Sequence, residues 1–142
     1  MFAGIATAIP DGRPGPALYA VTAQTWASTV RVINVVQTGT GLVLTMNYDA
    51  KDSRKIGIFA PGHKDAFYIV SGGKRYPLIA AAGIAIGSTS QQVPVGGSLI
   101  FTLTFAPLDD PLLPFDLIEG EHTAASSASY WDITGIQLKP RQ

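Results

Sequence analysis

The segment SLIFTLTFAPLDDPLLPFDLIEG, residues 98–120, contains the clearest structural signal in the chain. Its first half alternates large apolar side chains with smaller or more polar ones, and this period of two is typical of a strand with one face in a hydrophobic core. The apolar residues of the alternation are Leu99, Phe101, Leu103 and Phe105. Prolines follow and force the chain to turn, because proline fixes φ and lacks a backbone donor. The segment therefore predicts a buried strand, an exposed corner and a second short strand.

Other parts of the chain repeat this alternation between turn residues. The expected strands are residues 29–36, 42–48, 55–59, 66–70, 75–79, 99–105, 115–118 and 131–138. The turns TGTG (38–41) and SGGK (71–74) join neighbouring runs closely enough to form hairpins. Only AAAGIAI (80–86) has the composition of a helical turn, so the helical crossovers of a parallel sheet are not expected. The pattern favours an all-β antiparallel sandwich or barrel, and we expect a β-sandwich of about seven to nine strands.

The composition indicates one domain with sparse and balanced charge. We expect residues 1–20, rich in Gly, Pro and Ala, to form an N-terminal arm or an edge strand, and residues 21–142 to form a single β-sandwich domain. Ten basic residues balance ten acidic ones, so neither nucleic acid nor a membrane is an expected partner. The chain has no cysteine, which excludes disulfides and thiolate metal sites. A soluble protein is expected, and no sequence feature indicates its compartment.

Two loose clusters of acidic and amide side chains are candidate metal ligands. One comprises Asp109, Asp110, Asp116 and Glu119, and the other comprises Asn47, Asp49 and Asp52. A metal site needs several oxygens that converge on one point, and neither the spacing of a calcium loop nor a histidine pair is present. We therefore expect solvated turn carboxylates, with Glu119 hydrogen-bonded at a strand end, and neither a metal nor another cofactor.

Candidate catalytic residues do not form a recognisable set. His63 and His122 each lie in a loop composition, and the chain has no G-x-S-x-G motif. The serines near the second histidine are Ser126, Ser127 and Ser129. Glu119 and Glu121 are the nearest pair of carboxylates, but nothing opposite them would hold a substrate. SGGKRYPL has no helix after its glycines, so it is not a phosphate cradle. We expect a protein that is not an enzyme.

Aromatic side chains are the remaining candidates for a binding site. Tyr130 and Trp131 are consecutive, so in a strand one of them enters the core and the other stays outside. An exposed aromatic ring can stack on a sugar or anchor a protein partner. The commoner role of such a ring is to fill the core.

The motifs FTLTFAPL (101–108), FDLIEG (115–120) and WDITGIQL (131–138) together resemble the end of a family of small bacterial β-sandwich accessory domains. VRVINVVQTGTGLVLTMNY (30–48) is similar to the first hairpin of that family, and KRYPLIAAAGI (74–84) to its central strand. The resemblance implies an immunoglobulin-like sandwich of the kind found beside thioredoxin-like or caspase-like domains. It implies no catalytic residues.

The expected function is therefore a non-enzymatic accessory module that mediates protein–protein or interdomain interaction. Its partner would be another protein, a neighbouring domain or a second copy of the chain. Because charge is too sparse to steer a partner, we expect the interaction surface at a sheet edge or an apolar patch. The alternative is a carbohydrate-binding sandwich, with Tyr130 or Trp131 exposed beside another aromatic ring.

Overall fold

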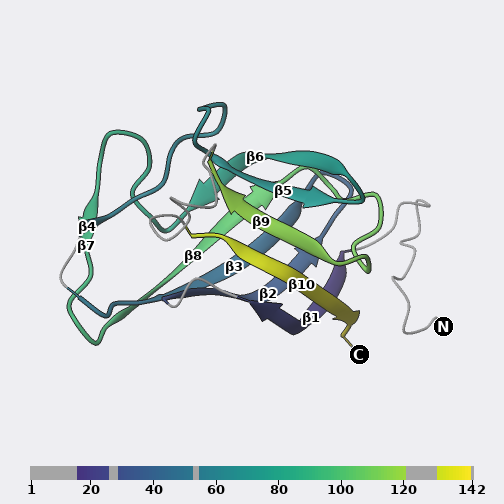
Figure 1. The fold of residues 1–142 in the computed structure, drawn as a ribbon, viewed down its shortest axis with the longest axis horizontal. Helices are drawn as coiled ribbons and strands as arrows, with labels where there is room; N and C mark the ends of the chain where they lie inside the picture. The colour runs from purple at the N-terminus through teal and green to yellow at the C-terminus, as the bar shows by residue number, and fades with distance from the viewer. Residues whose placement is uncertain (1–15, 26–28, 53–54, 121–130, 142) are drawn as a thin grey trace.

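The structure is a computed structural model, and it describes residues 16–25, 29–52, 55–120 and 131–141. The strands of this part are β1 (Ala17–Thr25), β2 (Val30–Gln37), β3 (Leu42–Asp49), β4 (Lys55–Ile56), β5 (Phe67–Ser71), β6 (Lys74–Ala82), β7 (Gln91–Gln92), β8 (Ser98–Phe105), β9 (Phe115–Glu119) and β10 (Ile133–Pro140). Eight of them close into a barrel in the order β1-β10-β9-β5-β6-β8-β3-β2, and β4 pairs with β7 in a projecting extension (Figure 1). The described residues contain no helix that could cross a membrane.

The prediction of an all-β antiparallel fold is confirmed, but the sandwich needs a correction. Strand β1 pairs with β2 on one side and with β10 on the other, so the strands form one closed sheet and not two open ones. Residues 17–20, expected in an arm or an edge strand, are the first part of this closing strand. Residues 1–15 of the predicted arm lie outside the described residues.

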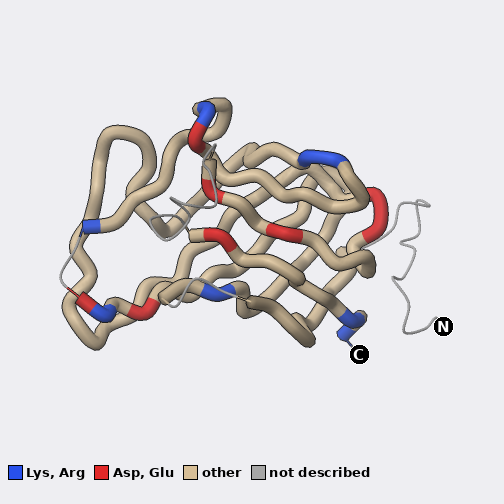
Figure 2. Tube along the Cα trace, viewed as in Figure 1, with Lys and Arg blue, Asp and Glu red and all other residues tan. Residues whose placement is uncertain are grey.

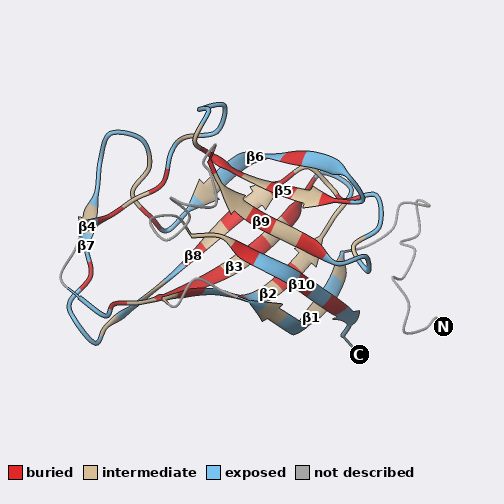
Figure 3. Ribbon diagram, in the orientation of Figure 1, coloured by how far each residue is buried: buried red, intermediate tan, exposed pale blue. Residues whose placement is uncertain are grey.

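The interior of the barrel is filled by the inward faces of its strands, visible as the buried bands of Figure 3. The register of β3 against β8 places Leu44 opposite Leu103 and Met46 opposite Phe101. Three of the residues predicted to be buried on β8 are buried, whereas Leu99, at the start of the strand, is half-buried. The largest fully buried side chains are Phe67, Phe101, Phe105, Phe115, Leu42, Leu44, Met46, Ile69, Leu103, Leu117, Ile133 and Ile136.

Both predicted hairpins are confirmed. In TGTG the Thr38 N–H donates to the Gly41 carbonyl at 2.8 Å and closes the β2–β3 turn. In SGGK the two central glycines have φ values of 59° and 77°. Positive φ at both positions of a two-residue turn matches the right-handed twist of the strands and favours glycine. The hairpin therefore sets Ser71 opposite Lys74 and fixes the register of β5 against β6.

Two glutamine side chains complete the hydrogen bonding where backbone pairing stops. The β1–β2 ladder pairs residues 17–19 of β1. Further along, Gln24 Nε2 donates to the Val32 carbonyl at 2.8 Å and Gln24 Oε1 accepts the Val32 N–H at 2.9 Å. At one end of the barrel, Gln37 Nε2 donates to the Leu108 carbonyl at 3.0 Å and Gln37 Oε1 accepts the Leu108 N–H at 2.9 Å. The second pair holds the proline-rich corner against the barrel, and Leu108 is buried there.

Gln37→Ala is expected to lower the free energy of unfolding by about 1–3 kcal/mol, because it leaves the partly buried Leu108 N–H and carbonyl without their partner. Urea denaturation measures the loss. Gln137→Ala, at an exposed position of β10, is the matched control and should change stability by less than about 0.5 kcal/mol. Equal effects of the two substitutions would contradict a bracing role for Gln37.

The β4–β7 extension forms an apolar layer of its own that continues the core. Ile56, Ile58, Ile84 and Val93 are buried there. The predicted strand 55–59 is shorter than expected, since pairing with β7 covers Lys55 and Ile56, and Ile58 makes an isolated bridge with Ile86. In the stretch AAAGIAI, β6 ends at Ala82 and a bend follows, so it forms no helical turn.

Candidate functional site

Trp131, one of the two predicted binding residues, packs against the core of the barrel. Its ring centroid lies 5.2 Å from that of Tyr48 and 6.2 Å from that of Phe101, with tilts of 35° and 32°. The residue is half-buried. These contacts explain Trp131 as a packing residue near the end of β3 and the start of β8. Tyr130 lies outside the described residues.

The acidic residues of β9 stabilise the junction between β9 and β10. Glu119 Oε1 accepts the Trp131 N–H at 2.7 Å, and Asp132 Oδ1 accepts the Glu119 N–H at 3.0 Å. Asp116 Oδ1 accepts the N–H of Gly135 at 2.9 Å, beside the irregularity in the β9–β10 pairing. The prediction of Glu119 as a hydrogen-bonded strand-end carboxylate is confirmed.

The proline-rich corner carries exposed carboxylates, as predicted. Asp109 lies 3.3 Å from Lys74 Nζ, and its N–H donates to the Tyr76 hydroxyl at 3.3 Å. Asp110 Oδ1 accepts the Leu112 N–H at 3.0 Å, which shapes the turn. Burial raises the pKa of the Tyr19 hydroxyl, and the Asp110 carboxylate adds to the rise. No group of three or more His, Asp or Glu side chains in the described residues is arranged to hold a metal.

The second acidic cluster, Asn47, Asp49 and Asp52, lies partly in a strand and partly in the bend after it. Asn47 lies within β3, inside the expected strand of residues 42–48, and it is buried, which corrects the expectation that this cluster is solvated. Asp49 ends the strand, and Asp52 is exposed in the bend that follows. The three side chains therefore lie in different environments along the chain.

The candidate nucleophilic and basic residues are mostly outside the described part of the chain. These residues are Glu121, His122, Ser126, Ser127 and Ser129. His63 is described, and its Nδ1 accepts the Asp65 N–H at 3.0 Å. Its ring stacks on Phe59 with centroids 4.5 Å apart. The histidine is therefore oriented by its own loop.

One side of the barrel presents an outer surface of uncharged side chains. It is formed by two neighbouring rows of cross-strand partners on β1, β2, β3, β8 and β6. The first row is Leu18, Val36, Val43, Thr104 and Ala80, and the second is Asn34, Thr45, Thr102 and Ala82. We call these nine residues the uncharged wall. Leu18 is 47% exposed, and at the margin of the wall Arg141 Nη1 donates to Asn34 Oδ1 at 2.8 Å.

The rest of the barrel surface has a different chemistry. Strands β9 and β10 carry Asp116, Glu119 and Lys139, and the β5–β6 hairpin carries Lys74 and Arg75. Figure 2 shows charges on these elements, in the loops and on β2, where Arg31 is exposed beyond the two rows of the wall, with uncharged stretches along β3 and β8 between them. The two sides of the barrel therefore offer a partner different kinds of contact.

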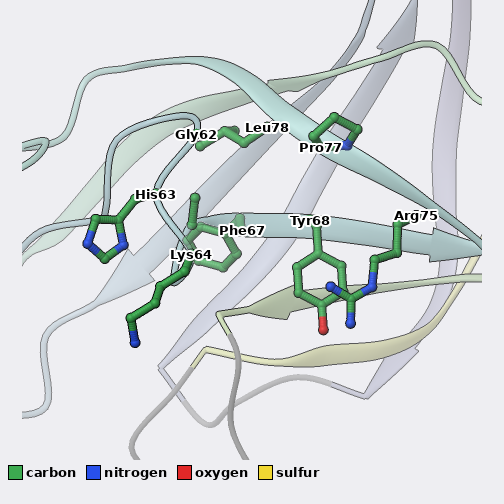
Figure 4. Close-up of a pocket in the computed structure, with 9 residues that line it drawn as sticks. Gly62, His63, Lys64, Phe67, Tyr68, Arg75, Pro77 and Leu78 are labelled. Carbon is green, nitrogen blue, oxygen red and sulfur yellow. The ribbon is translucent and has the colours of Figure 1, made fainter.

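A pocket of about 300 Å³ lies between the loop of residues 60–66 and the β5–β6 hairpin (Figure 4). Its lining residues are Gly62, His63, Lys64, Ala66, Phe67, Tyr68, Arg75, Pro77 and Leu78. The sequence analysis considered His63 only as a catalytic base and did not expect a pocket here. The available signal was the SGGK turn, since its register places Tyr68 and Arg75 on the same face of the hairpin.

Comparisons with known proteins assign no function to the uncharged wall or to the pocket. The chain matches no protein-family model, no curated protein and no solved structure in those comparisons. The resemblance to bacterial accessory domains therefore stays a prediction.

Proposed function

We propose that this chain is a non-enzymatic accessory module, which docks to a partner protein or a neighbouring domain through its uncharged wall. The observation that carries the proposal is the wall itself. Across five neighbouring strands, each outward-facing side chain of two rows is apolar, a threonine or an amide. A surface of this composition is desolvated at lower cost than one with charged groups, and such surfaces mark protein–protein contacts.

The closed barrel decides how a partner would meet this surface. Closure gives every barrel strand a neighbour on both sides, so none of them is an edge strand to which another strand could be added. The sheet-edge option expected from the sequence is therefore not offered by these strands. A partner docks face-on, with its own side chains against Val43, Thr104 and their neighbours.

The resemblance of three strand motifs to accessory domains supports the same function, because such modules act beside other domains. The alternative of carbohydrate binding has less support. A sugar platform needs exposed, coplanar aromatic rings, whereas the Trp131 ring is tilted against Tyr48 and Phe101.

The proposal is tested with a photo-crosslinking amino acid placed at Val43, on the wall, or at Thr134, on the exposed face of β10. We expect Val43 to capture a defined partner, or a second copy of the chain, and Thr134 to capture neither. The identified partner should then bind the purified wild-type protein. Val43→Lys should weaken this binding at least about tenfold, because it places a charge in the centre of the contact. Thr134→Lys should leave the affinity unchanged.

Equal capture from both positions, or full affinity of the Val43→Lys variant, would refute docking through the wall. A glycan array and sedimentation velocity address the alternative, and we expect the array to show no binding. Saturable glycan binding by a monomer, abolished by Trp131→Ala at unchanged stability, would replace docking by carbohydrate recognition.

A further inference from the structure

Strand β1 is the least buried strand of the barrel. None of its nine residues is buried, whereas every other barrel strand contributes at least one buried side chain to the core (Figure 3). Tyr19 and Val21 pack against the core from the outside of it and are half-buried. The strand therefore covers the core without filling it, and its release would open no cavity inside the barrel.

The pairing of β1 with β2 covers only part of the two strands. In their described residues, the ladder joins residues 17–19 of β1 to residues 35–37 of β2 and ends there. Further along, the side-chain amide of Gln24 binds the N–H of Val32 at 2.9 Å and its carbonyl at 2.8 Å. This amide lies where the peptide group of a paired strand would lie. A side-chain contact therefore replaces the backbone ladder over the second half of β1.

The pairing of β1 with β10 is irregular. Its register shifts between Val21 and Ala23 and again between Ala23 and Thr25, and each shift disrupts the backbone ladder locally. Between the shifts, the Thr22 hydroxyl donates to the Gln137 carbonyl at 3.1 Å in an exposed position. Exposed hydrogen bonds and little buried apolar surface are typical of segments that open well below the free energy of global unfolding. We therefore expect β1 to detach before the rest of the barrel unfolds.

A second copy of the chain can fill the place that β1 leaves. Release of β1 gives β2 and β10 free edges, and unpaired edges are templates for another strand. The β1 strand of a second copy fits both edges, because it forms every contact that the first copy lost, including the bonds of Gln24 to Val32. Its sequence, ALYAVTAQT, has no charged residue that would oppose insertion. The segment that joins β1 to β2, residues 26–29, is short, and short hinges favour exchange between copies.

We propose that β1 is an exchangeable strand, and that two copies of the chain form a dimer by trading it. In this dimer each β1 lies between β2 and β10 of the other copy, so that both barrels are closed again. A dimer of this kind needs no permanent sheet edge. The proposal goes beyond docking through the uncharged wall and does not depend on it, because exchange uses the backbone of β1 and docking uses outward-facing side chains.

The test mixes two single-cysteine variants of the full chain, Leu18→Cys and Val36→Cys. These positions are cross-strand partners, and the chain has no cysteine of its own. Such partners have Cα atoms about 4.5–5.5 Å apart, within the range of a disulfide. The mixture is incubated reduced at about 0.5 mM, which favours association by mass action, and is then oxidised. We expect the mixed disulfide to exceed either homodisulfide at least about fivefold, because exchange brings only the mixed pair together.

Val43→Cys mixed with Thr104→Cys is the matched control. These residues are partners in the β3–β8 ladder, and exchange of β1 leaves both in their own copy, so we expect no mixed disulfide. Disulfides from both mixtures without preference for the mixed pair would overturn exchange and would support contact between two copies through the uncharged wall. The absence of a mixed disulfide from either mixture would also overturn exchange, but it would leave docking to a different protein intact.

Gln24→Ala provides a kinetic readout of the same exchange. The bonds of Gln24 to Val32 exist in the monomer and form again in the dimer, so their loss should raise the exchange rate at least about fivefold and leave the dimer fraction at equilibrium unchanged. In the wild-type monomer, the protected amides of β1 should exchange with deuterium at least about 100-fold faster than those of β3. Equal protection of β1 and β3, or an exchange rate unaffected by Gln24→Ala, would overturn the proposal.

Discussion

Phe101→Ala is expected to lower the free energy of unfolding by about 3–5 kcal/mol. Phe101 is 2% exposed, lies opposite Met46 in the β3–β8 ladder, and has the Trp131 ring 6.2 Å from its own. The substitution removes a full aromatic ring at the point where three elements meet, and the barrel cannot collapse around the void without shifting its strands. Denaturant unfolding, followed by far-UV circular dichroism, measures the loss.

The neighbouring residue of the same strand provides the control. Ile100 is 52% exposed on the outer face of β8, so Ile100→Ala should cost less than about 1 kcal/mol. Phe101→Leu retains part of the buried volume and should fall between the two alanine variants, which keeps the comparison available if Phe101→Ala does not fold. A loss below about 1 kcal/mol for Phe101→Ala would mean that the register of β8 is wrong.

Gly120→Ala is the second substitution with a large expected effect, about 2–4 kcal/mol of lost stability. Gly120 has a φ of +76°, a conformation that disfavours any side chain. A methyl group here would lie 3.0 Å from the Asp65 carbonyl oxygen and 3.1 Å from Asp65 Cα. Since both are backbone atoms, the loop before β5 would have to move away from the end of β9. Thermal unfolding measures the effect.

Substitutions at two other glycines separate the two causes of the expected stability loss, namely the positive φ and the close contact with Asp65. Gly62 has a φ of +89° with no atom within 4 Å of its hypothetical Cβ, and Gly39 has an open Cβ position without a positive φ. Gly62→Ala should cost about 1 kcal/mol, and Gly39→Ala should change stability by less than about 1 kcal/mol in either direction. If Gly120→Ala lowers stability no more than Gly62→Ala does, the close approach of Asp65 does not constrain the end of β9.

Much of the fold was predictable because alternation is strong wherever a strand has one buried face. Residues 98–105 show it most clearly, and their strand runs from Ser98 to Phe105. The SGGK turn also fixed its hairpin, since glycine chemistry and turn length determine register. These signals are local, and they place each strand without saying which strands are neighbours at the ends of the sheet.

The closure of the sheet could not be predicted for a physical reason. Strand β1, ALYAVTAQT, has a weak alternation, and its pairing with β10 shifts register between Val21 and Ala23 and again between Ala23 and Thr25. Each shift moves the following side chains to the other face, so no single period describes the strand. Recognition of the barrel required a pairing between residues more than a hundred positions apart.

The candidate sites were less predictable than the fold. The donors around the pocket come from a loop and from a hairpin, and the loop residues His63 and Lys64 have no pattern that relates them to Arg75. The uncharged wall spans five strands, so it exists only once their order and register are known. Trp131 was singled out as an aromatic side chain, but its neighbours Tyr48 and Phe101 come from distant strands.

The pairing of β1 with β10, which closes the barrel, also limits how early in synthesis the chain can complete its fold. Strands β1 and β10 are the first and last described strands, and the hydrogen bond from Thr22 Oγ1 to the Gln137 carbonyl spans 115 residues of chain. During synthesis, β1 has no partner on that side until the ribosome has released β10. The high contact order of this topology favours folding in milliseconds to seconds. Until then, the two strands at the unsealed seam have unpaired edges, and this interval is when the chain is most exposed to aggregation.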